Sequence, residues 1–337
     1  MRDFAHQTPC LAFFLVVFLC LLFYLPSPEC SEPNTHKPKT LQKVRLILQW
    51  LPQAQFAGYY VAHERGLYKK YGIDLEILPS GPDAPPSVFL REKKAEFATM
   101  WLSTAIQKRA NGLRLINIGQ MIQRSALMLV VKKDSGIKRP ADLHNKKVSI
   151  FDGDFSIQPM ALFKRLSINP RLITQSTTVN LFLRGGVDAV SAMWYNEYHM
   201  ILSAGINPEE LQTFLYSDYG LNFPEDGIYV LESFFKDHAD IACAFVKASI
   251  EGWEYALLRP EEAVDTVLKR MIEAGVPANR AHQKWMLLRI GDLMRHKGKD
   301  GLGVLFKNDY DLVAKELQGL GLINKIPAFE DFHISCR

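Results

Sequence analysis

Strand-like and helix-like segments alternate along the first third of the chain. Residues 44–49 alternate apolar and polar side chains as a strand does, whereas the apolar spacing of residues 59–68 is helical until Gly72 ends it. The alternation continues with a strand at 73–78, a helix at 85–92, a strand at 97–100, a helix at 104–111 and a strand at 115–118. This order predicts an α/β fold of layered, parallel sheets.

A short segment of the chain occurs twice. The sequence Phe-Leu-Arg at 89–91, followed at 96–101 by a strand that ends in Met-Trp, has a counterpart at 182–184 and 188–194. The similarity is short, so chance coincidence is the alternative interpretation. If the repeat is real, two similar lobes each place a Met-Trp pair at the carboxyl end of a strand, where open α/β sheets bind ligands. A cleft between the lobes is then expected.

The later part of the chain divides into connectors and helices. The 337 residues suffice for about two domains. Residues 132–136 end the first half of the fold, and residues 137–142 connect it to a strand at 147–150 in the second half. Residues 219–224 are expected to return the chain to the first half. From Ala239 onward the pattern predicts helices at 239–258, 260–274, 277–296 and 309–317.

An apolar run at residues 11–25 follows Arg2 and precedes Pro26. It is shorter than the ~20 residues of a membrane-spanning helix. It therefore predicts a cleaved secretory signal, with an uncleaved membrane anchor and lipidation at Cys30 as alternatives. Residues 31–40 read as a tether. The folded part, from about residue 41, is expected on the periplasmic or extracellular side.

Charge and cysteine content exclude two classes of site. Lys plus Arg exceeds Asp plus Glu by 40 − 36 = 4, and the basic residues are scattered, which argues against nucleic acid as a partner. The five cysteines lack metal-ligand spacing, which argues against zinc. Removal of the signal leaves Cys243 and Cys336, which either bond or stay free. The apolar neighbours of Cys243 favour a buried structural thiol.

Known catalytic motifs are absent from the sequence. It contains no G-x-S-x-G, H-E-x-x-H, Walker or G-x-G-x-x-G pattern. Asp152 and Asp154 suit a divalent cation, although a solvated turn is the more common role of such a pair. No catalytic residue, metal or cofactor is expected.

Aromatic and polar side chains gather after the predicted strands. Trp50 follows Gln49, and Trp194 opens a run of aromatic, amide and acidic residues. Flat aromatic faces beside a few hydrogen-bonding groups suit a planar heterocycle. For the aromatics the alternative is core packing, and for Asp226 it is a solvated loop. The predicted ligand-binding residues are Gln49, Trp50, Trp101, Ser103, Trp194, Tyr195, Asn196, Glu197, Asp226 and Tyr229.

Several short motifs carry a resemblance to a known family. They are QWLP at 49–52, YYVA at 59–62, ERGLY at 64–68, YGIDLE at 71–76, IKRPADL at 137–143, WYNEY at 194–198 and PEDGIY at 224–229. From about residue 44 to 274 the chain resembles ABC-importer solute-binding proteins of the NMT1/THI5-like family. That branch includes nitrate, taurine, thiamine-pyrimidine-precursor and riboflavin binders, and also the fungal thiamine pyrimidine synthase. The last two motifs resemble the bacterial pyrimidine and flavin binders most.

The resemblance implies an α/β, two-lobed periplasmic-binding-protein fold of type II, a Venus flytrap. Lobe 1 is expected to comprise residues 41–131 and 227–337, and lobe 2 residues 132–226. The implied function is that of a monomeric extracytoplasmic protein. It captures a heteroaromatic vitamin precursor, related to the thiamine pyrimidine or to riboflavin, and passes it to an ABC permease.

Two alternatives belong to other functional classes. The fungal synthase has a His after the strand that matches 97–100 and a cysteine-rich cluster near 219–229. Here those stretches contain Trp101, Ser103 and Asn222, which counts against synthase chemistry. The second alternative is a sensor ectodomain held by an uncleaved anchor at residues 11–25.

Overall fold

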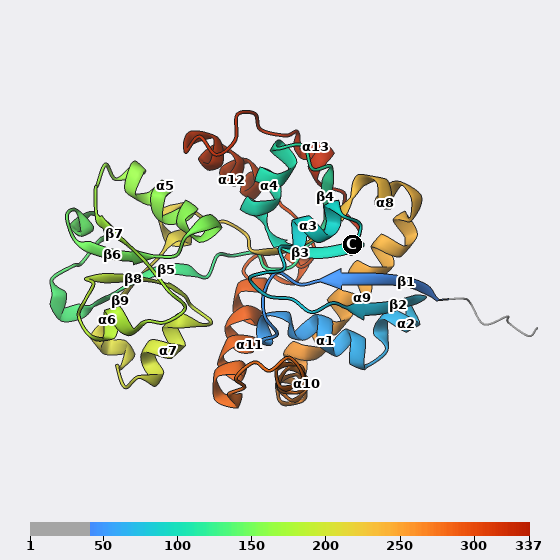
Figure 1. Cartoon of the computed structure of the whole chain (residues 1–337), viewed down its shortest axis with the longest axis horizontal. Helices are drawn as coiled ribbons and strands as arrows, with labels where there is room; N and C mark the ends of the chain where they lie inside the picture. The colour runs from blue at the N-terminus through green and yellow to red at the C-terminus, as the bar shows by residue number, and fades with distance from the viewer. Residues whose placement is uncertain (1–40) are drawn as a thin grey trace, which may run out of the picture. The chain divides into compact units, whose positions relative to one another are not determined.

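The structure, a computed structural model, describes residues 41–337. The predicted signal at 11–25 and tether at 31–40 lie outside this range. The described residues form two five-stranded mixed sheets, each with helices on its faces, and each sheet with its helices is one lobe (Figure 1). Within residues 41–337 no helix is long and apolar enough to cross a membrane. The predicted α/β, two-lobed fold is confirmed.

The sheet of lobe 1 has the strand order β2-β1-β3-β10-β4. Its strands are β2 (Ile73–Ile77), β1 (Gln42–Ile47), β3 (Phe97–Trp101), β10 (Asp226–Leu231) and β4 (Leu115–Gln120). Strand β1 runs parallel to β2 and β3, whereas β10 runs antiparallel to β3 and β4. The prediction of parallel sheets is therefore wrong for β10, which enters this sheet from the other lobe in the opposite direction.

The sheet of lobe 2 repeats this arrangement, with the order β7-β6-β8-β5-β9. Its strands are β7 (Arg171–Thr174), β6 (Lys147–Ile150), β8 (Ala189–Met193), β5 (Leu127–Lys132) and β9 (Leu211–Leu215). Strands β3 and β8 are central in their sheets, and each lies next to one antiparallel strand. The two repeated segments thus hold equivalent places in the two sheets.

The first lobe boundary differs from the expected one. Strand β5 pairs with β8 and β9, so residues 127–131 belong to lobe 2 and not to lobe 1. The chain crosses between the sheets after β4, at residues 121–126, and returns before β10, at residues 220–225. Local sequence pattern does not show this shift, because β5 is as apolar as any central strand of either sheet.

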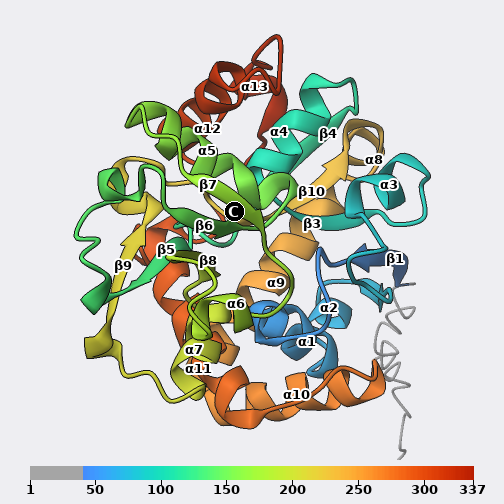
Figure 2. The ribbon, with the colours of Figure 1, turned by 60° about the vertical axis from the view of Figure 1, so that its left-hand side comes forward.

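Lobe 1 carries most of the helices. They are α1 (Ala57–Glu64), α2 (Leu67–Lys70), α3 (Pro86–Arg91), α4 (Leu102–Ala110), α8 (Glu232–Asp237), α9 (Ala239–Leu258), α10 (Pro260–Glu273), α11 (Arg280–Met294), α12 (Lys307–Gly319) and α13 (Phe329–Phe332). Helices α1, α9 and α10 pack on one another, and α12 packs on α4. In lobe 2, α5 (Ile157–Arg165) covers one face of the sheet, and α6 (Asn180–Leu183) and α7 (Glu197–Ser203) cover the other (Figures 1 and 2).

Two glycines allow α1 and α9 to pack at close range. A Cβ atom at Gly252 would lie 2.3 Å from the carbonyl oxygen of Gly58, and one at Gly58 would lie 2.3 Å from the ring of Trp253. Both distances are shorter than non-bonded atoms permit. The contact between these two helices therefore requires glycine at both positions.

We expect Gly252→Ala to lower the free energy of unfolding by about 1–3 kcal/mol or more, because the added methyl group must separate two packed backbones. Urea denaturation measures this change. Gly319→Ala is the control, since a Cβ there meets no atom within 4 Å. An unchanged urea midpoint for Gly252→Ala would contradict the close helix contact.

A disulfide joins Cys243 of α9 to Cys336 near the carboxyl terminus. The two Cα atoms lie 4.6 Å apart, and the bridge spans 93 residues. The expectation of a structural thiol at Cys243 is therefore wrong: the partner is remote in sequence, and the apolar neighbours gave no sign of it. Stable disulfides form in oxidising compartments.

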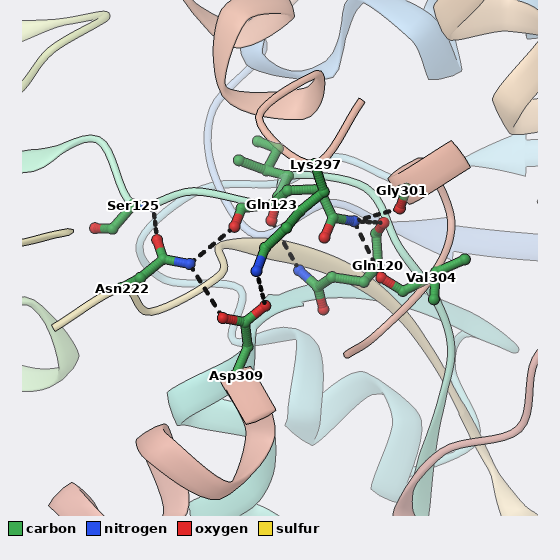
Figure 3. A network of polar contacts seen from close by, with 9 residues as sticks. Gln120, Gln123, Ser125, Asn222, Lys297, Gly301, Val304 and Asp309 are labelled. Carbon is green, nitrogen blue, oxygen red and sulfur yellow. Dashed lines mark hydrogen bonds and ion pairs between the residues drawn. The ribbon is translucent and has the colours of Figure 1, made fainter. Parts of the chain in front are cut away.

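Hydrogen bonds tie the two crossovers to each other. Asn222 in the second crossover accepts from Ser125 N at 3.0 Å and donates through Nδ2 to the carbonyl oxygen of Gln123 at 3.1 Å, both in the first crossover (Figure 3). Asn222 Nδ2 also lies 3.4 Å from Asp309 Oδ1, and Lys297 pairs with the other oxygen of Asp309 at 3.4 Å. The segment after α11 thus braces the crossovers.

Candidate functional site

A cavity of about 580 Å³ lies between the two lobes. Its walls come mainly from segments that follow the carboxyl ends of β1, β3, β6, β7 and β8, as expected for open α/β sheets. The lining residues are Gln49, Trp50, Leu51, Gln53, Gln55, Pro85, Pro86, Ser87, Met100, Trp101, Thr104, Lys108, Phe151, Asp154, Phe155, Gln175, Ser176, Thr177, Met193, Tyr195, Asn196 and Glu197.

Six of the ten predicted residues line this cavity: Gln49, Trp50, Trp101, Tyr195, Asn196 and Glu197. The other four lie outside its lining. Ser103 is buried in α4, and Tyr229 is fully buried in β10. Asp226 is buried behind the cavity wall, where it contacts lining residues.

Trp194 faces a different part of the protein from the one predicted. Its ring lies 5.0 Å from the guanidinium of Arg289, and its carbonyl oxygen accepts from Trp285 Nε1 at 3.1 Å. Both partners belong to α11 of lobe 1. Trp194 therefore contributes to the contact between the lobes, and its predicted place in the cavity is corrected.

Aromatic side chains from both lobes face the cavity. Trp50 and Trp101 come from lobe 1, and Phe151, Phe155 and Tyr195 come from lobe 2. The rings of Trp101 and Phe155 meet edge to face, with centroids 4.3 Å apart. Neither Phe151 nor Phe155 is among the predicted site residues, although both follow the predicted strand at 147–150. Open α/β sheets bind ligands at the carboxyl ends of their strands, and the same expectation for the strand at 147–150 would have identified both phenylalanines.

Asp226 anchors two glutamines of the lobe 1 wall. It accepts hydrogen bonds from Gln49 Nε2 and, at 2.8 Å, from Gln55 Nε2. Gln55 in turn accepts from Gln53 Nε2. Burial raises the pKa of Asp226 to about 7, although the two amide hydrogen bonds act in the opposite direction. The carboxylate thus fixes the orientation of amides that line the cavity.

Glu197 has a similar role in lobe 2. Its carboxylate accepts from the backbone N–H of Met193 at 2.9 Å and from Asn196 Nδ2 at 2.7 Å. Burial raises its pKa above the usual range for a carboxyl group. These bonds join the end of β8 to the start of α7. Glu197 therefore shapes the turn that presents Tyr195 and Asn196 to the cavity.

Asp154 connects the lobes at one edge of the cavity. It comes from lobe 2 and accepts hydrogen bonds from Thr104 Oγ1 and, at 3.1 Å, from Gln107 Nε2, both on α4 of lobe 1. The alternative of a cation at Asp152 and Asp154 gains no support. Within residues 41–337 there is no group of three or more His, Cys, Asp or Glu side chains able to hold a metal ion.

Two histidines stack where α7 of lobe 2 meets α11 of lobe 1. The ring centroids of His199 and His282 lie 4.8 Å apart. Burial lowers the pKa of His282 to about 4, and the neighbouring His199 adds to this effect. Burial also lowers the pKa of His199. Protonation of this pair is therefore unfavourable while the two helices remain in contact.

We expect His282 to contribute a loss of stability as the pH falls from about 6.5 toward 4, whereas buried carboxyls with raised pKa, such as Asp226, act in the opposite direction, so the contribution of His282 is read from the difference between wild type and variant. The pKa of His282 is lower in the folded state than in the unfolded chain, so the unfolded chain binds more protons across this window. The thermal midpoint, measured from pH 7.5 to 4.5, should fall less steeply in His282→Gln. His144→Gln, at an exposed position, is the control. Equal slopes for wild type and His282→Gln would contradict the prediction.

The chain is similar in sequence to proteins named for the small molecules that they bind. The riboflavin-binding protein RibY of Chloroflexus aurantiacus is 25% identical over 284 residues, which cover 77% of each chain. The formylaminopyrimidine-binding protein of Halalkalibacterium halodurans is 22% identical over 280 residues, which cover 79% of this chain and 81% of the relative.

The fold also matches solved structures. The periplasmic aliphatic sulphonate-binding protein SsuA of Escherichia coli superposes with a TM-score of 0.65 at 17% identity, over 86% of this chain and 91% of that chain. Residues 53–263, more than half of the chain, match the family described as NMT1/THI5 like. The predicted family is thus confirmed, and the chain belongs to the NMT1/THI5-like family.

Proposed function

We propose that this protein is an extracytoplasmic solute-binding protein that captures a heteroaromatic vitamin precursor for an ABC importer. The ligand is related to the thiamine pyrimidine precursor or to riboflavin. The observation that carries the proposal is the cavity at the carboxyl ends of strands from both lobes, where aromatic rings of both lobes face amide groups. The names of the relatives that bind riboflavin and formylaminopyrimidine support the same ligand class.

Capture works through a difference in affinity between two arrangements of the lobes. Trp50 and Trp101 belong to one lobe, and Phe155 and Tyr195 to the other, so a flat ligand contacts both sets only when the lobes are close together. A ligand that binds this arrangement better shifts the population toward it. The same movement shields the ligand from water until the permease receives it.

Two features support a location outside the cytoplasm. The disulfide between Cys243 and Cys336 suits an oxidising compartment. The apolar run at residues 11–25 suits a secretory signal. The protein acts there as a monomer, with the membrane permease as its partner.

The test is to purify the exported protein, denature it and identify any released small molecule by mass spectrometry. The expected compound is a pyrimidine or a flavin, bound at one molecule per chain. Isothermal titration calorimetry with that compound then gives the affinity. Release of an aliphatic sulfonate or another non-aromatic solute would contradict the proposal.

We expect no synthesis of the thiamine pyrimidine when the protein is supplied with iron, pyridoxal phosphate and histidine. Trp101 ends β3 where the synthase has a His nearby, and Asn222 takes part in crossover hydrogen bonds in the region of the cysteine cluster. Product is measured by mass spectrometry against a heat-killed control. Pyrimidine formed above that control would favour the enzyme.

A further inference from the structure

Two buried carboxylates hold amide side chains of the cavity wall by their nitrogen atoms. Asp226 accepts from Gln49 Nε2, and Glu197 accepts from Asn196 Nδ2. An ionised carboxylate only accepts hydrogen bonds, so each amide must turn its nitrogen toward the carboxylate and its oxygen away from it. Across residues 41–337 no group donates a hydrogen bond to Gln49 Oε1 or to Asn196 Oδ1.

Gln175 repeats this arrangement without a carboxylate. It follows β7 and is only 7% exposed. Its Nε2 donates at 2.8 Å to the carbonyl oxygen of Ser191, a group that also only accepts. Gln175 Oε1 is buried, and none of the described residues gives it a hydrogen-bond partner. A buried acceptor without a donor is unfavourable, so this atom is suited to a donor on a bound molecule.

We propose that the cavity recognises its ligand through the amide oxygens of Gln49, Gln175 and Asn196. It therefore selects a heteroaromatic ring that carries amino groups over the same ring with carbonyl groups in those places. This inference rests on the proposed function and narrows its ligand class. Asp226 and Glu197 are positioning residues, which set the direction of the amides: Asp226 lies outside the cavity lining, and both oxygens of Glu197 already accept hydrogen bonds from Met193 N and Asn196 Nδ2.

Trp101 adds a hydrogen-bond donor to the three amide oxygens, which are acceptors. Its Nε1 is buried without a hydrogen-bond partner among the described residues, and its side chain lines the same cavity. An indole N–H only donates, so it matches an acceptor such as a ring nitrogen. A ring nitrogen beside an amino group presents an acceptor next to a donor. An amino-substituted pyrimidine therefore complements both Trp101 and the amide oxygens.

The experiment compares two probes of nearly equal shape, 4-amino-2-methylpyrimidine and 2-methylpyrimidin-4-one. Competition calorimetry at pH 8.5, above the pKa of about 7 of Asp226, keeps that carboxylate ionised. We expect the wild-type protein to bind the amino probe on the order of 10-fold more tightly, because the carbonyl probe leaves amide oxygens unpaired.

Two variants test the positioning role. In Asp226→Asn the new amide both donates and accepts, so one of its two glutamine partners must reverse, and the preference for the amino probe should fall several-fold. Gln175→Met removes one acceptor at similar length, and it should also lower the preference without loss of folding. Asp237→Asn is the control, since Asp237 is an exposed carboxylate at the end of α8 and outside the cavity lining, and it should retain the wild-type ratio.

The outcomes separate this inference from the proposed function. An unchanged ratio in both Asp226→Asn and Gln175→Met overturns the inference. So does a wild-type protein that binds riboflavin but prefers the carbonyl probe, and in that case the proposed function stands. If neither probe nor riboflavin binds the wild-type protein, the proposed function and the inference fall together.

Discussion

The double variant Cys243→Ala, Cys336→Ala is expected to lower the free energy of unfolding by about 3–5 kcal/mol. The bridge closes a loop between residues 93 positions apart, so its loss returns a large conformational freedom to the unfolded chain. Both cysteines pack against the hydrophobic core, which adds a smaller loss of contact. Guanidinium denaturation under non-reducing conditions measures the change.

The control for this variant is wild-type protein under reducing conditions. Reduction removes the cross-link but keeps both side chains, so it should reproduce most of the loss. If the double variant and the reduced wild type both unfold at the midpoint of the oxidised protein, the bridge contributes nothing to stability. A large loss in the variant with no loss on reduction would assign the effect to packing of the side chains.

Trp50→Ala is expected to weaken ligand binding by about 5- to 150-fold. An aromatic face that stacks on a flat ring contributes roughly 1–3 kcal/mol, by analogy with bases stacked on aromatic side chains. Trp50 is half-buried and lines the cavity, so the thermal midpoint of the empty protein should change little. Calorimetry with the co-purified ligand measures the affinity.

Trp194→Ala is the matched comparison for Trp50→Ala. Its ring lies beside Arg289 outside the cavity, so its loss should affect the contact between the lobes more than the stacking on the ligand. Normal binding by Trp50→Ala together with strongly weakened binding by Trp194→Ala would contradict this assignment of the site.

The helices and strands of lobe 1 before residue 120 were predictable because the spacing of their apolar residues matches the side chains that are buried in the fold. Strands β3 and β4 are buried along their whole length, and residues 97–101 and 115–118 are mostly apolar. Strand direction was not predictable in the same way. The antiparallel β5 and β10 carry no local signal of their direction, which follows from how the crossovers place them.

The candidate site was predictable for residues that directly follow the carboxyl end of a strand. Side chains at the carboxyl ends of strands include Gln49, Trp101 and Tyr195, and all three line the cavity. Gln175 was missed because its role depends on Ser191, sixteen positions later in the chain, in β8, which β6 separates from β7. Trp194 was predicted to line the cavity because it follows a strand, and its position in the sequence does not show that it will contact Trp285 and Arg289 of α11.

The crossover hydrogen bonds have a consequence for how long a ligand stays bound. Asn222 links the two crossovers to each other and to Asp309, so the backbone rotations that separate the lobes must disturb this network. A stiffer hinge slows lobe opening, and for an enclosed ligand the dissociation rate then follows the opening rate. Under the proposed function, residence time therefore depends partly on the segment after α11, at positions outside the cavity lining.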